Sequence, residues 1–114
     1  MSAVPFAAGI ACINKMKRLD LPKLLREKGE RLCDGLRVAA QKHGYDLRVS
    51  GAPALFYLRV ANDDSLMIHQ RFIAEMVRRG VYLTNHHNHF LNYALSDADI
   101  KETVEIADDV FRTL

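Results

Sequence analysis

The apolar N-terminal segment is the feature that most constrains this fold. From Ala3 to Ile13 nearly every residue is apolar, and the pattern predicts a helix with Pro5 in its first turn. Phe6, Ile10 and Ile13 recur at helical spacing, but alanines leave the other sides of the helix apolar as well. A helix that is apolar all round must be buried all round. We therefore expect either a partner subunit or a missing part of a longer polypeptide to cover it.

Composition and charge narrow the class of protein. Of the 114 residues, 49% are hydrophobic and 26% are charged, which suffices for one small globular domain and excludes a disordered chain. The net charge is +2 and no basic run is present, which excludes a nucleic-acid binder that works through bulk charge. The apolar N-terminal segment is too short to span a bilayer and lacks a basic leader, so we expect no membrane partner.

The two cysteines indicate the compartment. Cys12 and Cys33 fall in segments with helical character, and they do not form a Cys-x-x-Cys pair. We expect both thiols to be small core residues of a reduced, cytoplasmic protein.

Periodicity predicts the remaining elements. The expected order is a helix over 20–43 closed by Gly44, strands over 47–50 and 55–60, a helix over 68–77 closed by Gly80, strands over 81–83 and 90–93, and a last helix capped by Ser96. This order indicates an α+β fold in which helices pack on a small, mainly antiparallel sheet. Gly29 and Gly35 are expected to weaken the second helix by about 1 kcal/mol each relative to alanine.

Several polar side chains carry expectations of their own. Glu27 and Arg31 are expected to pair on the wet side of the second helix. His43 and His69 are expected on the polar sides of their helices. Every lysine, Lys28 included, is expected at the surface, so none is expected to be desolvated enough to act as a nucleophile.

The side chains best able to bind a ligand are concentrated in loop 84–89, which reads Thr-Asn-His-His-Asn-His. Three imidazoles in four residues could bind a metal, but a zinc site usually draws a further ligand from elsewhere in the chain, and we expect no metal. Two interpretations stay open. The loop is either a polar turn with exposed histidines, or it points His87 or Asn88 into a cleft made jointly with another domain, where the side chain hydrogen-bonds a substrate.

Other catalytic devices are missing from the sequence. There is no Gly-rich phosphate loop, and no Ser or Cys stands in a nucleophile motif. We therefore expect neither a catalytic nor a cofactor-binding residue in this chain alone.

Five stretches together resemble one enzyme family. Arg79–Leu83, His86–Leu91 and Ser96–Ile100 are similar to the C-terminal signature of class III pyridoxal-phosphate (PLP) aminotransferases, on the branch of the glutamate-1-semialdehyde aminomutases. Ala3–Ala11 resembles the helix that follows the cofactor-lysine region, and Glu30–Leu36 resembles the long helix that enters the small domain. The match runs along the whole chain in the family's order.

This resemblance implies the C-terminal small domain of a fold-type I enzyme. Residues 1–18 would form a helix that joins the missing large domain, and residues 19–114 would form the small domain. In the family the large domain carries the lysine that holds PLP and the aspartate that pairs with its ring nitrogen, so the isolated chain is expected to hold no cofactor and to be inactive. The parent is expected to be a homodimer that moves an amino group between a small amine or amino acid and a carbonyl compound.

The resemblance also singles out site residues. His87 falls where the aminomutases carry a glutamate close to the substrate, which makes it the candidate substrate-proximal residue, with His86 and Asn88 beside it. The imidazole there, and Leu95 where the family has histidine, favour general amine transfer over aminomutase activity. A second hypothesis stays open, namely an autonomous α+β binding or interaction module that shares only the topology.

Overall fold

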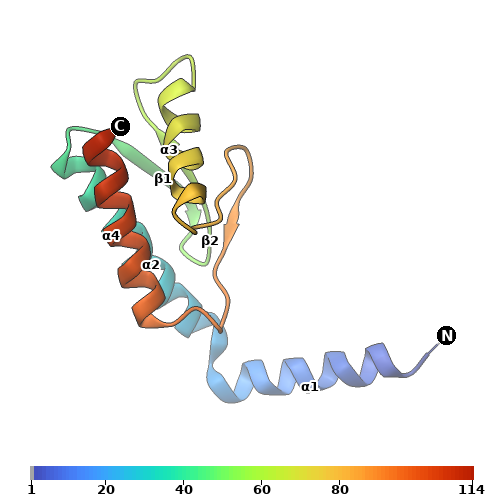
Figure 1. Cartoon of the computed structure of the whole chain (residues 1–114). Coiled ribbons are helices and arrows are strands. Elements are labelled where there is room, and N and C mark those ends of the chain that lie inside the picture. The colour runs from blue at the N-terminus through green and yellow to red at the C-terminus, as the bar shows by residue number, and fades with distance from the viewer. Residues whose placement is uncertain (1) are drawn as a thin grey trace.

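The computed structural model describes residues 2–114, and it confirms the α+β fold class. The elements are α1 (Val4–Leu19), α2 (Leu21–Lys42), β1 (Leu47–Ala52), β2 (Leu55–Val60), α3 (Met67–Arg78), β3 (His89–Phe90) and α4 (Asp97–Thr113), as Figure 1 shows. The three strands form one antiparallel sheet in the order β1-β2-β3. The observed order of elements differs from the predicted one by a single missing strand.

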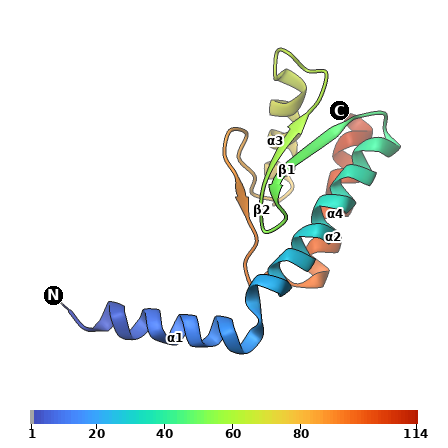
Figure 2. The same ribbon diagram turned by 180° about the vertical axis from the view of Figure 1, so that it is seen from behind.

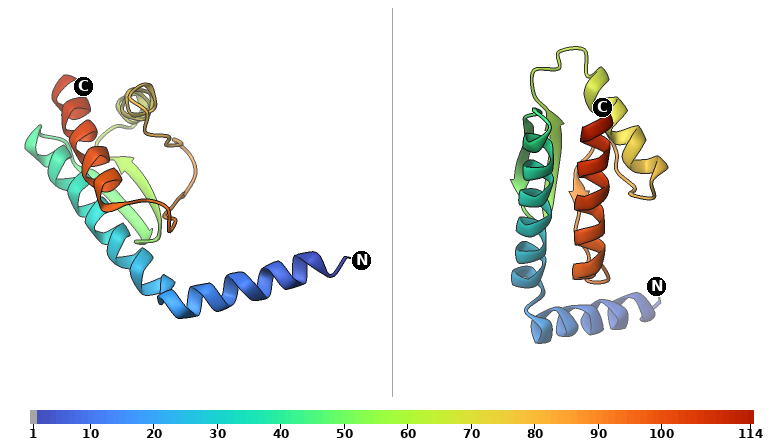
Figure 3. Two further views of the ribbon diagram at one scale, coloured as in Figure 1. Left: turned by 60° about the horizontal axis from the view of Figure 1, so that its bottom comes forward. Right: turned by 60° about the vertical axis from the view of Figure 1, so that its left-hand side comes forward.

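The core covers one face of the sheet. In β2, Phe56, Leu58 and Val60 are buried, whereas the residues between them point to the other face and are exposed or half-buried. Helices α2, α3 and α4 pack on the buried face, where α2 and α4 run side by side (Figure 3). Phe72 of α3 stacks on Phe111 of α4 with ring centroids 4.5 Å apart. The core therefore joins three helices to one sheet face.

Capping residues lie where the sequence predicts them, after α2 and α3 and at the start of α4. Gly44 and Gly80 adopt φ values of 82° and 91°, a conformation that costs glycine little. At the start of α4 the Ser96 hydroxyl accepts the backbone N–H of Asp99 at 3.1 Å. The Asp99 carboxylate in turn accepts the backbone N–H of Ser96 at 2.8 Å, which completes a capping box.

Helix α1 projects away from the other elements (Figures 1 and 2). None of its residues is buried by the described chain, and Val4 and Phe6 keep 73% and 62% of their surface exposed. The radius of gyration is 16.4 Å, whereas a compact chain of this length has roughly 13 Å. Cys12 also lies exposed on α1, so its expected core position is wrong, whereas Cys33 is buried as expected.

The predicted strand over 81–83 is wrong. The backbone N–H of Val81 donates to the carbonyl of Met76 at 3.0 Å, which closes the end of α3 instead of starting a sheet ladder. The strand expected over 90–93 is shorter and lies earlier, because β3 pairs only its two residues with Leu55 and Phe56. Leu55 is the first residue of β2, so the chain runs past the end of the sheet after β3.

Two side chains of α2 reach across to the segment that leads into α4, contrary to expectation. Arg31 pairs with Asp97 at 2.7 Å instead of with Glu27 on its own helix. Lys28 is only 8% exposed, and its ammonium group donates to the carbonyl of Leu95. The prediction that Lys28 lies at the surface is therefore wrong, because the backbone carbonyl gives its charge a partner inside the fold.

Candidate functional site

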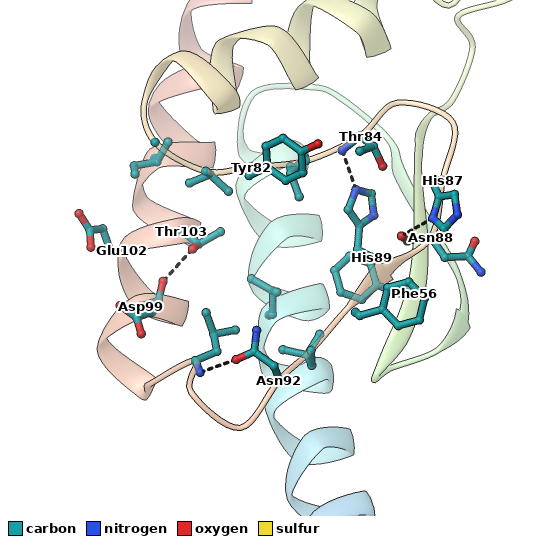
Figure 4. A pocket seen from close by; sticks show the side chains of 18 of the residues that line it. Phe56, Tyr82, Thr84, His87, Asn88, His89, Asn92, Asp99, Glu102 and Thr103 are labelled. Carbon is teal, nitrogen blue, oxygen red and sulfur yellow. Dashed lines mark hydrogen bonds between the residues drawn. The ribbon is translucent and has the colours of Figure 1, made fainter. Parts of the chain in front are cut away.

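A pocket of about 710 Å³ lies between segment 79–95 and helix α4 (Figure 4). Leu32, Phe56 and Ile106 give it apolar walls. Its polar residues come from two sides, because Thr84, His87, Asn88, His89 and Asn92 belong to the segment and Asp99, Glu102 and Thr103 belong to α4. The pocket therefore combines an apolar interior with hydrogen-bonding groups, the composition typical of small-molecule sites.

The structure brings two of the three predicted site residues to this pocket. His87 and Asn88 line it, and in Figure 4 both lie on the side of the pocket opposite α4. His86 is exposed and does not line the pocket. The His87 Nδ1 atom lies 3.0 Å from the carbonyl oxygen of Asn88, and its ring lies 6.3 Å from that of Phe90. The loop thus places His87 and Asn88 at the pocket with both side chains exposed.

His89 closes the loop on itself. The backbone N–H of Thr84 donates to His89 Nε2 at 3.2 Å, which bridges the two ends of loop 84–89. The His89 ring also stacks on the buried Phe56 ring with centroids 5.3 Å apart. Burial lowers the pKa of His89 below its ordinary value of 6.5, although the backbone groups of Thr84 and Phe56 oppose this shift.

His69 supports the same loop from beneath. Only 1% of its surface is exposed, so its predicted position on the polar side of α3 is wrong. Its Nε2 atom lies 3.1 Å from the carbonyl oxygen of Asn85, and its backbone N–H donates to Asp63 at 2.8 Å. Burial lowers the pKa of His69, although Asn85 and the charge of Asp63 oppose this shift. Sequence spacing could have found His69, because Phe72, three residues on, lies on the buried face of α3.

Two acidic groups frame this arrangement. Burial would raise the pKa of Asp63, but hydrogen bonds from the backbone of His69 and Ile68 and from Ser65 outweigh it and lower the pKa. On the α4 side, hydrogen bonds from the Ser96 hydroxyl and backbone lower the pKa of Asp99. Both carboxylates are therefore ionised at neutral pH, and the Asp99 charge borders the pocket.

Residues 2–114 offer neither a metal site nor a membrane-spanning helix. There, no group of three or more His, Cys, Asp or Glu side chains is placed to hold a metal ion. Over the same residues no helix combines the length and apolar character needed to cross a membrane.

Known proteins resemble this chain along nearly all of its length. No family model matches the sequence. The chain is 32% identical over 110 residues to the aminopentol aminotransferase of Sphingopyxis macrogoltabida, which covers 96% of this chain and 26% of that protein. It also superposes with a TM-score of 0.93 and 31% identity on the PLP internal aldimine form of the FumI protein of Sphingopyxis sp. MTA144, covering 98% of this chain and 27% of that one.

Both likenesses place the chain in the same class of protein. The fold is that of one segment of a PLP enzyme, and the chain spans about a quarter of the length of both relatives. The sequence relative is an aminotransferase, so the expected resemblance to PLP-dependent aminotransferases is confirmed.

The residues that line the pocket bear on whether PLP fits there. Among the described residues that line it there is no lysine to hold the cofactor. Lys28, the buried lysine, donates to the carbonyl of Leu95 and does not line the pocket. The pocket therefore does not fit PLP by itself.

Proposed function

We propose that this chain is the C-terminal small domain of a class III PLP-dependent aminotransferase, on the branch of the glutamate-1-semialdehyde aminomutases. Residues 1–18 would join the large domain, and residues 19–114 would form the small domain. The observation that carries the assignment to a PLP enzyme is the TM-score of 0.93 at 31% identity over 98% of the chain. At that identity and coverage, common ancestry explains the likeness better than a shared topology does. The class and branch are supported by the motif resemblance at Arg79–Leu83, His86–Leu91 and Ser96–Ile100.

The whole parent would move an amino group between a small amine or amino acid and a carbonyl compound. PLP would supply the chemistry, held by residues outside this chain, because the pocket here has no lysine among its described lining residues. The isolated chain would accordingly be inactive. The parent would act as a homodimer, and the large domain or the second subunit would cover α1.

Within the parent, His87 and Asn88 would contact the substrate, with His86 beside them. All three side chains are exposed in the described chain, so each is free to contact a group supplied by the rest of the parent. His87 and Asn88 also line the pocket, where an imidazole and an amide can both donate and accept hydrogen bonds. Such side chains suit a substrate with hydroxyl, carbonyl or amine groups. A glutamate at position 87 would favour a cationic group instead, which supports general amine transfer over aminomutase activity.

A chimera tests the proposal. This chain replaces the matching segment of the S. macrogoltabida aminotransferase, and amino transfer from an amine to a carbonyl acceptor is measured. The control carries the same segment with Gly29→Ala, which is expected to disturb packing between α2 and the β1–β2 turn. We expect the chimera to bind PLP and to transfer amino groups. A folded chimera that binds PLP but transfers none would contradict the proposal.

The isolated chain gives a second test. PLP is added to the purified 114-residue protein, and absorbance is compared with that of free PLP. We expect no lysine-dependent band, and a strong band lost on Lys28→Met substitution would contradict the assignment of the cofactor site to missing residues. A monodisperse chain that binds some other ligand, with an inactive chimera, would favour the autonomous binding module.

A further inference from the structure

Two histidines hold loop 84–89 at separate points. His89 accepts the backbone N–H of Thr84 through Nε2 at 3.2 Å, so it ties the first residue of the loop to the last. His69, on α3, contacts the carbonyl oxygen of Asn85 through Nε2 at 3.1 Å, so it ties the loop to the body of the domain. Between these points lie the exposed side chains of His86, His87 and Asn88, of which His87 and Asn88 line the pocket.

The two contacts require opposite tautomers. A carbonyl oxygen can only accept, so His69 must carry its proton on Nε2 and leave Nδ1 unprotonated. A backbone N–H can only donate, so His89 must leave Nε2 unprotonated and carry its proton on Nδ1. The Nδ1 atoms of both rings are buried and have no hydrogen-bond partner among the described residues.

Protonation would affect the two tethers differently. A second proton on His69 would place a buried Nδ1–H where the described residues offer no acceptor. A second proton on His89 would sit on Nε2 and face the N–H of Thr84, so that a donor would meet a donor. The His89 tether therefore requires the neutral imidazole, whereas the His69 tether keeps its Nε2–H on protonation and gains only a buried Nδ1–H without a partner among the described residues.

We propose that His69 and His89 are positioning residues that fix loop 84–89 in one conformation while both imidazoles are neutral, and that the end of the loop at Thr84 is released when His89 is protonated. The role of the loop as the carrier of His87 and Asn88 rests on the proposed function. The clamp itself rests only on the contacts above. It would make presentation of the site residues dependent on pH, with the loop ordered above the pKa of these histidines.

The charged groups around His69 and His89, the two residues of the clamp, shift the pKa values of these residues in both directions. Asp63, beside the start of α3, favours the protonated form of His69, while Arg59 on β2 and His86 in the loop disfavour it. The backbone groups of Thr84 and Phe56 favour the protonated form of His89, while the charges of His69 and His87 disfavour it. Burial is the largest effect on both rings and favours the neutral form. The release should therefore occur below pH 6.5, the ordinary pKa of histidine.

Nuclear magnetic resonance on the ¹⁵N-labelled full chain tests the tautomers directly. Imidazole ¹H–¹⁵N correlation spectra distinguish a protonated from an unprotonated ring nitrogen in each histidine. At neutral pH we expect His69 to be protonated on Nε2 and His89 on Nδ1. The same tautomer in both rings, or a cationic form of either, would overturn the proposal.

Variants then test the positioning role. The side-chain amide of glutamine can donate or accept a hydrogen bond in place of the histidine Nε2 atom, but it does not take up a proton. Leucine can neither donate nor accept a hydrogen bond. We expect His89→Leu to speed hydrogen exchange of the Thr84 amide about tenfold at neutral pH, and His89→Gln to restore protection. With His69→Gln and His89→Gln together, the Thr84 and Asn85 amide shifts should stay constant as the pH falls below 6.5.

Control variants separate the clamp from the exposed histidines and from catalysis. His86→Gln and His87→Gln should leave the pH-dependent release intact, because neither imidazole contacts the loop backbone at the two tethers. Exchange of Thr84 unaffected by His89→Leu would overturn the clamp. None of these measurements uses substrate or PLP, so an inactive chimera with the expected tautomers would contradict the proposed function and leave the clamp supported.

Discussion

Gly29 on α2 lies directly against the backbone of Pro53 in the turn between β1 and β2. A Cβ atom at Gly29 would lie 2.0 Å from the Pro53 carbonyl oxygen, a distance that no real pair of atoms tolerates. Gly29 therefore permits the close approach of helix and hairpin. The expectation that Gly29 only weakens α2 is incomplete, because it considers helix propensity and not the neighbour.

Gly29→Ala should accordingly destabilise the protein by about 1–3 kcal/mol, the usual cost of overpacking, although alanine is the better helix former. Gly9→Ala is the matched control, since a Cβ there meets nothing within 4 Å. It should leave the free energy of unfolding unchanged or raise it by up to about 1 kcal/mol. Urea unfolding followed by circular dichroism measures both. An equal increase in the free energy of unfolding for the two variants would show that α2 and the hairpin do not approach each other as described.

The two cysteines should differ strongly in reactivity. Burial raises the pKa of the Cys33 thiol to about 11, whereas Cys12 is exposed on α1. Because the thiolate is the reactive form, a thiol reagent at neutral pH should label Cys12 in the folded chain and Cys33 only after denaturation. Mass spectrometry of the labelled peptides gives the site. In the chimera Cys12 should become protected, because the rest of the parent is proposed to cover α1; rapid labelling there would contradict that cover.

The free energy of unfolding should decrease as the pH is lowered, in two separate pH ranges. The pKa values of His69 and His89 lie below 6.5 in the folded chain, so below that pH the unfolded chain binds more protons. Their contribution to the free energy of unfolding is complete above pH 6.5 and is lost as the pH falls through their lowered pKa values. The pKa values of several carboxyls are also lowered, so a second loss begins below pH 3.8, from Asp63, Asp97, Asp99 and Asp108.

Urea unfolding at a series of pH values measures both losses. Replacing both histidines by glutamine should remove the loss of stability below pH 6.5 and leave the loss below pH 3.8 unchanged. If the loss below pH 6.5 persists in the double variant, it must come from other groups.

Local sequence signals predicted much of the fold. Ser96 with Asp99 predicted the start of α4, and Gly44 and Gly80 predicted the ends of α2 and α3, because caps depend on residues within a few positions of each other. The strand at 81–83 was wrong because β-propensity says nothing of whether a partner strand exists at that edge.

The candidate site was only partly predictable. Residue composition drew attention to loop 84–89, and one of the contacts that hold it, between His89 and Thr84, lies within the loop. The other comes from His69 on α3, and no local pattern in the loop points there. The buried positions of Lys28 and His69 could have been found from spacing, since Leu32 follows Lys28 by four residues and Ile73 follows His69 by four on buried helix faces. Both residues were predicted at the surface because they are polar. Each is tolerated inside the fold because a backbone carbonyl distant in the sequence accepts its hydrogen bond.

The central claim is that loop 84–89 presents His87 to the substrate of a PLP-dependent aminotransferase. The most direct measurement compares steady-state kinetics of the chimera carrying His87→Ala with those of the chimera carrying Gln41→Ala, an exposed position on α2 outside the pocket. We predict that His87→Ala raises KM for the amino donor about fivefold to tenfold, the loss expected for one hydrogen bond, with PLP absorbance unchanged. Identical kinetic constants for the two variants would contradict the claim.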